Sequence, residues 1–465
     1  MFLEKKGGKL KISLRKIIGL LEPLLYSLDA SKEEISGICL DSRKVKPGDL
    51  FVAINTGINF IPQALENGAA CVITEQKIFG IENIMIVESV IEALGKLAKL
   101  WLSKFDCQVI AVTGSCGKTT TTQMIAHILS VKHKVHSTFE NHNNKIGVPE
   151  TIFGIDEDTE FLVIELGTSE KGEIRYLAKM VTPDVGVITT IGHAHLEAFK
   201  TINGVRREKS ALLKQVKPDG LFVINGDNEQ CGIIISDCDY SRQLATFGLT
   251  ASCKVRADNL TVIDEWTSFE TVHNKGNAVL QFDFAVANHN IMNMLAAIAV
   301  ARHFKIDWLV IQESLESFQY PKMRFERSII NNITIINDAY NANPGSVMAA
   351  ILSAKAICVG RLFLILGDML ELGEQAEELH MKIVEFAKML NVDVVYGIGE
   401  YAGAAAVLMD NTENEFIKAA NKKSIVSELL DKVKPGDVVL FKASRAMRLD
   451  KLHDQFYERL SQLDS

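Results

Sequence analysis

A stretch early in the chain brings together the residue types that bind phosphate. Val109-Ile-Ala-Val-Thr-Gly-Ser-Cys-Gly-Lys-Thr-Thr120 runs from an apolar segment into two glycines, a lysine and threonines, and an amphipathic segment at 121–129 follows. This pattern predicts a strand, a tight loop and a helix. In such a loop the backbone N–H groups surround an anion, Lys118 reaches the outer phosphates, and Thr119 offers its hydroxyl to Mg²⁺. An ordinary glycine-rich turn is the alternative, which the coincidence of strand, loop and helix disfavours.

Two further apolar runs end in side chains that bind metals. The run Phe161-Leu-Val-Ile-Glu165 predicts a buried parallel strand that delivers Glu165 to the edge of a sheet, where an acid can hold Mg²⁺. A second run at 185–191 predicts a strand that leads to His193 and His195. A solvated glutamate and a structural histidine are the alternatives. The charged segment 206–209 that follows is typical, from its composition, of a solvated helix face.

Polar loops also follow predicted strands near the two ends of the chain. Asp41-Ser42-Arg43 lies beside a turn and is either a solvated turn or an anion site made by a hydroxyl and a guanidinium. Near the C-terminus, three such loops lie at 338–346, 367–373 and 442–448. Because the ends of parallel strands meet at one sheet edge, these three loops predict a second ligand surface.

The elements that must position these residues divide the chain into three α/β units, at 1–106, 107–320 and 321–465, with Pro321 at the second boundary. The first unit is expected to contain helices at 10–25, 61–67 and 91–103, with strands within 37–54 and at 70–74. Strands of the second unit are expected at 161–165, 185–191 and 221–225, with shorter strands over 244–284 and a helix at 290–301. The third unit is predicted to be doubly wound, with strands at 333–337, 362–366, 392–396 and 438–441, and helices at 345–357, 374–390, 424–433 and 447–461.

The composition excludes several classes of function. The chain has 465 residues, of which 47% are hydrophobic and 23% charged, with a formal net charge of −8. This balance is that of a globular protein, and the negative charge argues against a general nucleic-acid binder. The eight cysteines are scattered without a Cys-x-x-Cys pair, so we expect reduced, mostly buried thiols. Residues 1–13 lack an apolar signal-peptide core and no apolar run is long enough to span a membrane, so a cytosolic protein is expected.

A phosphate loop, an acid that holds Mg²⁺ and flanking α/β units predict an ATP site in a cleft between domains. From the residues alone, three classes of protein remain open. They are an ATP-dependent ligase, a nucleotide or small-molecule kinase, and a mechanical or switch NTPase.

Motifs in all three units carry a resemblance to a known family. They are Asp41-Ser-Arg-Lys-Val-Lys-Pro-Gly-Asp-Leu-Phe-Val-Ala53, Thr113-Gly-Ser-Cys-Gly-Lys-Thr-Thr120, Asn141-His-Asn-Asn-Lys-Ile-Gly-Val-Pro149, Glu165-Leu-Gly167, His195-Leu-Glu197, His289-Asn-Ile-Met-Asn293, Asn337-Asp-Ala-Tyr-Asn-Ala-Asn-Pro344, Leu366-Gly-Asp-Met-Leu-Glu-Leu-Gly-Glu374 and the segment 442–448. In these residues the chain resembles the Mur ligases, and among them the branch that adds D-alanyl-D-alanine to UDP-N-acetylmuramoyl-tripeptide. The phosphate loop is shared with folylpolyglutamate synthetases, whereas the stretches at 338–344 and 367–373 point to this branch.

The resemblance implies an α/β protein of three domains, with a UDP-substrate domain, a central P-loop ATPase domain and a C-terminal Rossmann-like domain that binds the dipeptide. It implies catalytic roles for Lys118, Lys209, His195 and Arg324, with Lys209 as a carbamylated lysine. The implied ATP-binding residues are Thr113, Gly114, Ser115, Cys116, Gly117, Lys118, Thr119, Thr120, Asn293, Arg324 and Asp338. Mg²⁺ ligands are implied at Thr119, Glu165 and His195. Substrate contacts are implied at Ser42, Arg43, Asn141, Asn143, Asn144, Tyr340, Asn341, Asn343 and Arg445.

The implied reaction moves the γ-phosphoryl group of ATP to the terminal carboxylate of the tripeptide, and the amine of D-alanyl-D-alanine then displaces phosphate. We expect a bacterial cytoplasmic enzyme that acts as a monomer, without nucleic acid or a membrane span. Two segments depart from the family pattern. A shorter segment at 56–62 replaces a glycine-rich stretch on the uridine side, and Thr168-Ser-Glu170 replaces a small residue, Asn and His. Another amide-forming ligase of the superfamily and a P-loop NTPase or kinase remain the alternatives.

Overall fold

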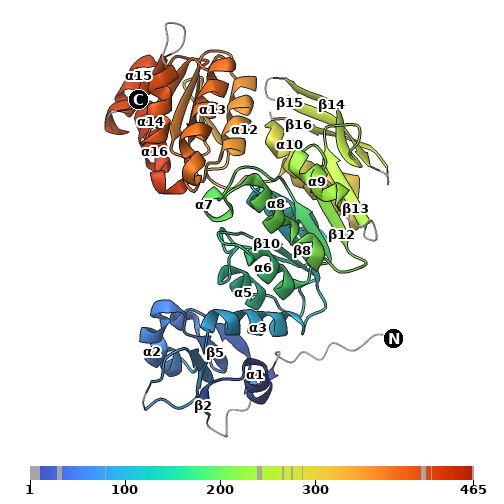
Figure 1. Ribbon diagram of the computed structural model, residues 1–465. Coiled ribbons are helices and arrows are strands. Elements are labelled where there is room, and N and C mark those ends of the chain that lie inside the picture. Colours follow the sequence, from blue (N-terminus) through green and yellow to red (C-terminus); the bar gives the residue numbers. More distant parts are fainter. Residues whose placement is uncertain are drawn as a thin grey trace.

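The computed structural model describes residues 11–28, 34–78, 80–237, 243–263, 266–273, 276–284, 286–409, 415–419 and 422–462. Three sequence-based expectations fall partly outside these ranges, namely the start of the helix predicted at 10–25, parts of the strands predicted over 244–284 and the thiol of Cys238. The chain forms three lobes in sequence order, each built on one large sheet (Figure 1). The predicted α/β fold class is confirmed.

The first lobe has a five-stranded sheet in the order β2-β7-β6-β5-β4, which is parallel except for the edge strand β2, and a small β1-β3 pair. Its elements are β1 (Ile12–Ser13), α1 (Leu14–Leu21), β2 (Leu25–Ser27), β3 (Glu34–Ile35), β4 (Gly37–Cys39), η1 (Ser42–Lys44), β5 (Asp49–Val52), η2 (Asn55–Phe60), α2 (Ile61–Glu66), β6 (Cys71–Thr74), β7 (Ile84–Ile86) and α3 (Val90–Leu102). The first helix is shorter than predicted because Glu22 adopts the left-handed conformation and Pro23 follows.

The central lobe has a nine-stranded sheet in the order β16-β15-β14-β13-β12-β11-β8-β10-β9. Its elements are β8 (Gln108–Thr113), α4 (Lys118–Ser130), β9 (Val135–Ser137), α5 (Gly147–Phe153), β10 (Phe161–Glu165), α6 (Glu173–Val181), β11 (Val185–Ile188), α7 (Leu196–Phe199), α8 (Ile202–Ser210), η3 (Leu213–Gln215), β12 (Leu221–Asn225), α9 (Glu229–Ser236), β13 (Gln243–Gly248), β14 (Val255–Ile263), β15 (Trp266–His273), β16 (Ala278–Phe282), α10 (Asn288–His303) and α11 (Trp308–Glu316). Strands β14 to β16 are antiparallel, and the others are parallel to their neighbours.

Strand β8 places the phosphate loop at the centre of this sheet. Its side chains alternate between two cores, with Val109 and Ala111 packed on the side of α3 and α6, and Ile110 and Val112 on the side of α4 and α10. The chain continues to β9 and β10 on one side of β8 and then crosses to β11 on the other side. The loop that follows β8 therefore lies at the topological switch point of the sheet, where parallel α/β sheets bind ligands.

The third lobe has a six-stranded sheet in the order β17-β18-β22-β19-β20-β21, in which only the edge strand β17 is antiparallel. Its elements are β17 (Glu326–Ile330), β18 (Ile333–Asn337), α12 (Pro344–Ala356), β19 (Leu362–Gly367), η4 (Gly373–Gln375), α13 (Ala376–Met389), β20 (Val394–Ile398), α14 (Tyr401–Met409), β21 (Glu415–Lys418), α15 (Lys422–Lys432), β22 (Val438–Lys442), η5 (Arg445–Met447) and α16 (Leu449–Gln462). Because β18, β22 and β19 are neighbours, the three polar loops predicted to share one sheet edge lie side by side.

The sequence analysis missed β17, α14 and β21, which are short elements at or near the edges of the third sheet. The residues of β17 carry no apolar alternation, and α14 is almost uniformly apolar, so neither shows the period of its class. The predicted strand at 392–396 lies two residues later, at Val394–Ile398. The predicted unit boundaries at 106/107 and 320/321 remain predictions, and each unit contains one of the three large sheets.

The carboxylate of Asp368, at the end of β19, holds the start of α14. It accepts hydrogen bonds from the backbone N–H groups of Glu400, Tyr401 and Ala402, at 2.8–3.1 Å, and it is almost fully buried. We expect Asp368→Ala to destabilise the third lobe by roughly 2–4 kcal/mol, because three helix N–H groups lose their acceptor. The melting temperature measures this, with Glu378→Ala as the control.

Glu378 is an exposed carboxylate on α13, and its salt bridge within the described residues is with Lys382 one turn away. Its replacement should change stability by less than about 0.5 kcal/mol. If the Asp368→Ala and Glu378→Ala proteins have the same melting temperature, the three N–H groups find other acceptors when the Asp368 carboxylate is removed.

Candidate active site

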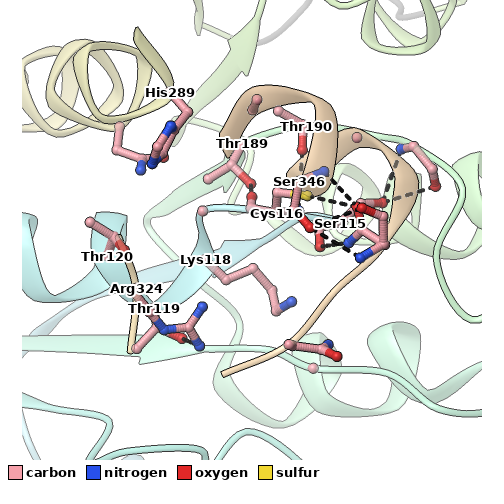
Figure 2. A pocket seen from close by; sticks show the side chains of 18 of the residues that line it. Ser115, Cys116, Lys118, Thr119, Thr120, Thr189, Thr190, His289, Arg324 and Ser346 are labelled. Atoms are coloured by element: carbon pink, nitrogen blue, oxygen red, sulfur yellow. Dashed lines mark hydrogen bonds between the residues drawn. The ribbon is translucent and has the colours of Figure 1, made fainter. Parts of the chain in front are cut away.

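A cavity of about 580 Å³ lies between the central and third lobes, and most of the residues predicted to act on ATP line it. The phosphate loop contributes residues 115–120, the end of β10 contributes Glu165, and the loop after β11 contributes residues 189–192 and His195. From the third lobe come Arg324, which precedes β17, polar residues that follow β18, and Lys442 at the end of β22. Figure 2 shows the Lys118 side chain extending into this cavity, with the Arg324 guanidinium beside Thr119.

Close packing explains why the phosphate loop needs its glycines. Gly117 has φ = 79° at the start of α4, and a side chain there would collide with the amide oxygen of Asn293. A side chain at Gly114 would collide with the hydroxyl of Thr189. The segment after β11 also supports the loop, since the backbone N–H of Ser115 donates to the carbonyl of Thr190 at 2.8 Å. These contacts hold the loop in this shape.

The side chains of Thr119 and Glu165, both predicted Mg²⁺ ligands, are in contact. The hydroxyl of Thr119 donates to Oε2 of Glu165 at 2.7 Å, and the amide of Asn143 donates to Oε1 at 2.7 Å. A hydroxyl and a buried carboxylate are hard oxygen donors that suit Mg²⁺. Among the described residues no three His, Cys, Asp or Glu side chains form a complete cation cage.

Lys209 is fully buried, so the interpretation of 206–209 as a solvated helix face is wrong for part of this segment. Burial, together with the charge of Lys118, lowers the pKa of Lys209 to about 7. Glu208 is also buried and accepts from the backbone N–H groups of Gly172 and Ile174 at the start of α6. On α8, Val205, Glu208 and Lys209 are spaced i, i+3 and i+4, so the two charged residues occupy the inward stripe of the helix. This spacing is the signal that could have revealed them.

The third lobe reaches the phosphate loop through two polar side chains. The guanidinium of Arg324 donates to the hydroxyl of Thr119 at 2.9 Å and stacks on the ring of Tyr340, 4.1 Å from its centroid. The amide of Asn343 donates to the carbonyl of Ser115 at 3.3 Å, while its oxygen caps α12 through the N–H of Ser346. The structure thus brings Arg324, Tyr340 and Asn343 to the cavity, where Asn341 and Asp338 also lie.

Among the cavity residues that were not predicted individually are Lys442 and His289. Lys442, at the end of β22, is buried and pairs with the carboxylate of Asp338 at 2.9 Å, and it donates to the carbonyl of Asn341 at 2.6 Å. A lysine that ends an apolar strand is the same signal that identified Glu165. His289 lies at the start of α10, and burial lowers its pKa to about 4, so it is neutral at physiological pH.

His195 contacts the third lobe. Its Nδ1 contacts Oε2 of Glu371, and the backbone N–H of Glu197 donates to the carbonyl of Glu371 at 3.1 Å. The hydrogen bond with His195 lowers the pKa of Glu371, and the charge of Lys118 acts in the same direction. His193 does not line the cavity, and burial lowers its pKa. Glu371 lies in the predicted loop at 367–373, but no pattern in the sequence pairs it with His195.

Four of the predicted substrate residues do not line this cavity. The hydroxyl of Ser42 donates to Gln63 at 2.6 Å, and the exposed guanidinium of Arg43 holds the carboxylate of Asp41, lowering its pKa to about 2. Asn141 is exposed on the loop after β9, and Arg445 pairs with Asp450 at 3.0 Å. Asn143 and Asn144 do line the cavity, and so does Asn293.

Thr168 and Ser169, in the segment 168–170 that departs from the family pattern, line the cavity. The backbone N–H of Ser169 donates to the buried carboxylate of Glu173 at 2.8 Å. Glu170 pairs with Lys145, which follows the cavity residue Asn144. The Glu173 carboxylate therefore lines the cavity beside this segment, together with the amides of Asn143 and Asn144.

Comparison with known proteins agrees with this geometry. The family model of the Mur ligase middle domain matches residues 112–301, and the model described as Mur ligase, glutamate ligase domain, matches residues 323–445. The UDP-N-acetylmuramoyl-tripeptide–D-alanyl-D-alanine ligase of Bacillus subtilis (strain 168) is 32% identical over 457 residues, which cover 95% of this chain and 98% of the relative.

Two solved structures share the whole architecture. A crystal structure of MurF from Acinetobacter baumannii is 28% identical, with a TM-score of 0.87, and the match covers 97% of this chain and 99% of that one. The structure of MurF ligase from Thermotoga maritima in complex with ADP is 30% identical, with a TM-score of 0.82 and coverage of 92% and 98%.

The chain belongs to the Mur ligase family, and it is an ATP-dependent ligase that forms amide bonds. Within this family, the relative from Bacillus subtilis, which matches almost the entire chain, is named for the ligation of D-alanyl-D-alanine to UDP-N-acetylmuramoyl-tripeptide. Among the described residues, no helix combines the length and the apolar character needed to cross a membrane.

Proposed function

We propose that the chain joins the amine of D-alanyl-D-alanine to the terminal carboxylate of UDP-N-acetylmuramoyl-tripeptide at the expense of ATP, in peptidoglycan precursor synthesis. The observation that carries this proposal is the single cavity in which Lys118 and Thr119 of the phosphate loop face Arg324 and Asn343 of the third lobe. A phosphate site and an acceptor surface in one cavity suit an enzyme that activates one substrate and captures a second. The reaction takes place in the bacterial cytoplasm, and one chain supplies both sides of the cavity, so a monomer suffices.

Positive charges would assist the first step, in which the γ-phosphoryl group passes from ATP to the carboxylate and forms an acyl phosphate. Lys118 and Arg324 neutralise negative charge on the transferring group, as phosphoryl transfer generally requires. Thr119 and Glu165 would hold one Mg²⁺ and His195 a second, and the metal would supply Lewis-acid stabilisation of phosphate charge. The guanidinium of Arg324 donates to the hydroxyl of Thr119 in this structure.

The second step would take place on the third-lobe side of the cavity. The dipeptide amine attacks the carbonyl carbon of the acyl phosphate, and inorganic phosphate leaves with the amide in place. Tyr340, Asn341 and Asn343 lie beside the phosphate loop and position the dipeptide. Asp338 contacts the nucleotide, and its buried pair with Lys442 fixes the direction of its carboxylate. Asn293 meets the adenine, and Ser42, Arg43 and Asn141 bind the UDP-muramoyl part outside this cavity.

Lys209 carries a carbamate in this proposal. Carbamylation consumes the neutral amine, which attacks CO₂, and a pKa of about 7 leaves a large fraction of the buried amine neutral at physiological pH. The product is an anion close to Lys118, where a negative charge is favourable. Only the protonated form of the unmodified lysine would place a second positive charge near Lys118.

Phosphate release from ATP tests the proposal. Purified protein is supplied with UDP-N-acetylmuramoyl-tripeptide, with either diamino acid at the third position, and with or without D-alanyl-D-alanine. We expect release to require both substrates and to yield an amide product of the corresponding mass. Release that is indifferent to both would contradict the ligase proposal and leave an ATPase in its place.

A further inference from the structure

We propose that Glu371 is a positioning residue for His195, and that the third lobe thereby completes a cation ligand of the central lobe. This inference rests on the proposed function, because it assigns a partner to a residue proposed to bind Mg²⁺. Its basis is the contact between Oε2 of Glu371 and Nδ1 of His195. The two residues lie 176 positions apart and belong to lobes built on different sheets.

The contact fixes which nitrogen of His195 carries the proton. A carboxylate can only accept, so the hydrogen lies on Nδ1, and Nε2 remains as the acceptor nitrogen of the ring. His195 lines the cavity, where that lone pair can serve a cation. A histidine that binds a metal usually donates its other N–H to a carboxylate or carbonyl, which orients the ring and raises its basicity. Glu371 supplies this partner.

The backbone on both sides of the contact is held in an unusual conformation. His195 has φ = 54° and Glu371 has φ = 63°, which place both in the left-handed region that non-glycine residues seldom adopt. Such conformations persist where the surroundings impose them. The backbone hydrogen bond from Glu197 to Glu371 ties the same two segments together. The geometry therefore depends on packing between the lobes more than on the free energy of a half-exposed ion pair.

The loop that carries Glu371 is anchored from within the third lobe. The N–H of Met369 donates to Nε2 of the buried His380 at 2.8 Å, and the N–H of Leu370 donates to the hydroxyl of Ser444 at 2.8 Å. Glu371 is thus presented on a rigid support, as a residue that orients a ligand must be. When the third lobe moves away, His195 loses this partner, so the cation site is complete only while the lobes are in contact.

The interface offers a matched control. Gln375 donates from its side-chain amide to the carbonyl of Lys200 at 3.0 Å, which links the same two lobes without touching His195. Gln375→Ala removes an interlobe hydrogen bond and leaves the histidine pair in place. Glu371→Ala removes the pair itself, and Glu371→Gln keeps the shape and an acceptor oxygen without the charge.

Two measurements on the full chain test the inference. The first is the side-chain ¹⁵N spectrum of labelled histidine, with the His195 signal assigned by its loss in His195→Ala. We expect the Nδ1-protonated tautomer in the wild type and in Gln375→Ala, and a shift towards the Nε2-protonated tautomer in Glu371→Ala. The second is Mn²⁺ binding in the presence of ADP, followed by electron paramagnetic resonance. We expect affinity about 10-fold lower in Glu371→Ala, an intermediate value in Glu371→Gln, and no change in Gln375→Ala.

Different outcomes separate this inference from the proposed function. A His195 tautomer that is the same in the wild type and Glu371→Ala would overturn it, and so would equal loss of Mn²⁺ affinity in Glu371→Ala and Gln375→Ala. Neither measurement requires turnover. A protein that shows the tautomer change but no release of phosphate dependent on the dipeptide therefore retains the positioning role of Glu371 and loses the proposed substrates.

Discussion

Replacing Lys118 by alanine is expected to lower the rate of phosphate release in the presence of both substrates by about 10³-fold. Lys118 is the first residue of α4, and its side chain extends into the cavity next to Thr119 (Figure 2). A preorganised positive charge at the transferring phosphoryl group contributes on the order of 10²- to 10³-fold or more to such reactions. Initial rates at saturating ATP, with kcat and KM separated, measure the effect.

Lys132→Ala is the matched control for this variant. Lys132 follows the same helix, but it is about half exposed, and its salt bridge in the described part of the chain is with the exposed Asp307, at 2.8 Å. Its removal should leave the rate unchanged and stability within about 1 kcal/mol. A Lys118→Ala enzyme that retains more than a tenth of the wild-type rate would remove Lys118 from the catalytic machinery and weaken the case for the entire phosphate site.

The parts of the site that depend on local sequence were predictable. The phosphate loop, its helix and Glu165 follow from an apolar strand that ends in a polar residue, because the strand itself determines where that residue lies. The same reasoning identified the loop after β18 that carries Asp338 and Asn343. The same reasoning would have identified Lys442, which ends strand β22. The sequence analysis named Lys442 only as part of a motif.

The parts that depend on packing between distant segments were not predictable from single runs of sequence. The role proposed for Glu371 depends on its contact with His195, which lies on another lobe. No periodicity in the sequence links these two residues. Lys209 lies between these cases. Its position on the inward stripe of α8 was visible, but a lysine in such a stripe is ordinarily assumed to face water, and only the packing of α8 against α6 and α9 shows that it does not.

In the Lys209→Met variant, the free energy of unfolding is expected to depend much less on pH than in the wild type. The pKa of Lys209 is about 7 in the folded chain against an ordinary value of 10.5, so between these values the unfolded chain binds more protons. Stability therefore rises with pH across this window, by up to about 5 kcal/mol in all and by about 2 kcal/mol between pH 7.5 and 9.0. Methionine has a similar length and no charge, so this gain disappears in the variant.

Denaturant unfolding of both proteins in CO₂-free buffer at pH 7.5 and 9.0 measures this difference. Other titrating groups contribute equally to the two proteins and cancel when the variants are compared. Equal pH dependence in wild type and Lys209→Met would show that Lys209 is not neutralised by burial. Because the chain has three lobes, the comparison uses the transition of the central lobe, where Lys209 lies.

Added bicarbonate separates the effect of burial from that of the proposed carbamate. At pH 8 the buried amine is mostly neutral and can take up CO₂, which replaces it with an anion beside Lys118. We expect bicarbonate to raise the wild-type rate of phosphate release and to leave Lys209→Met at a rate lower by roughly 10²-fold or more, since only the wild type can form the anion. A variant that matches the wild type in CO₂-free buffer and lags only with bicarbonate would assign the catalytic contribution to the carbamate alone. If the variant releases phosphate at the wild-type rate in both buffers, Lys209 has a structural role only. Its burial then lowers stability without increasing the rate of the reaction.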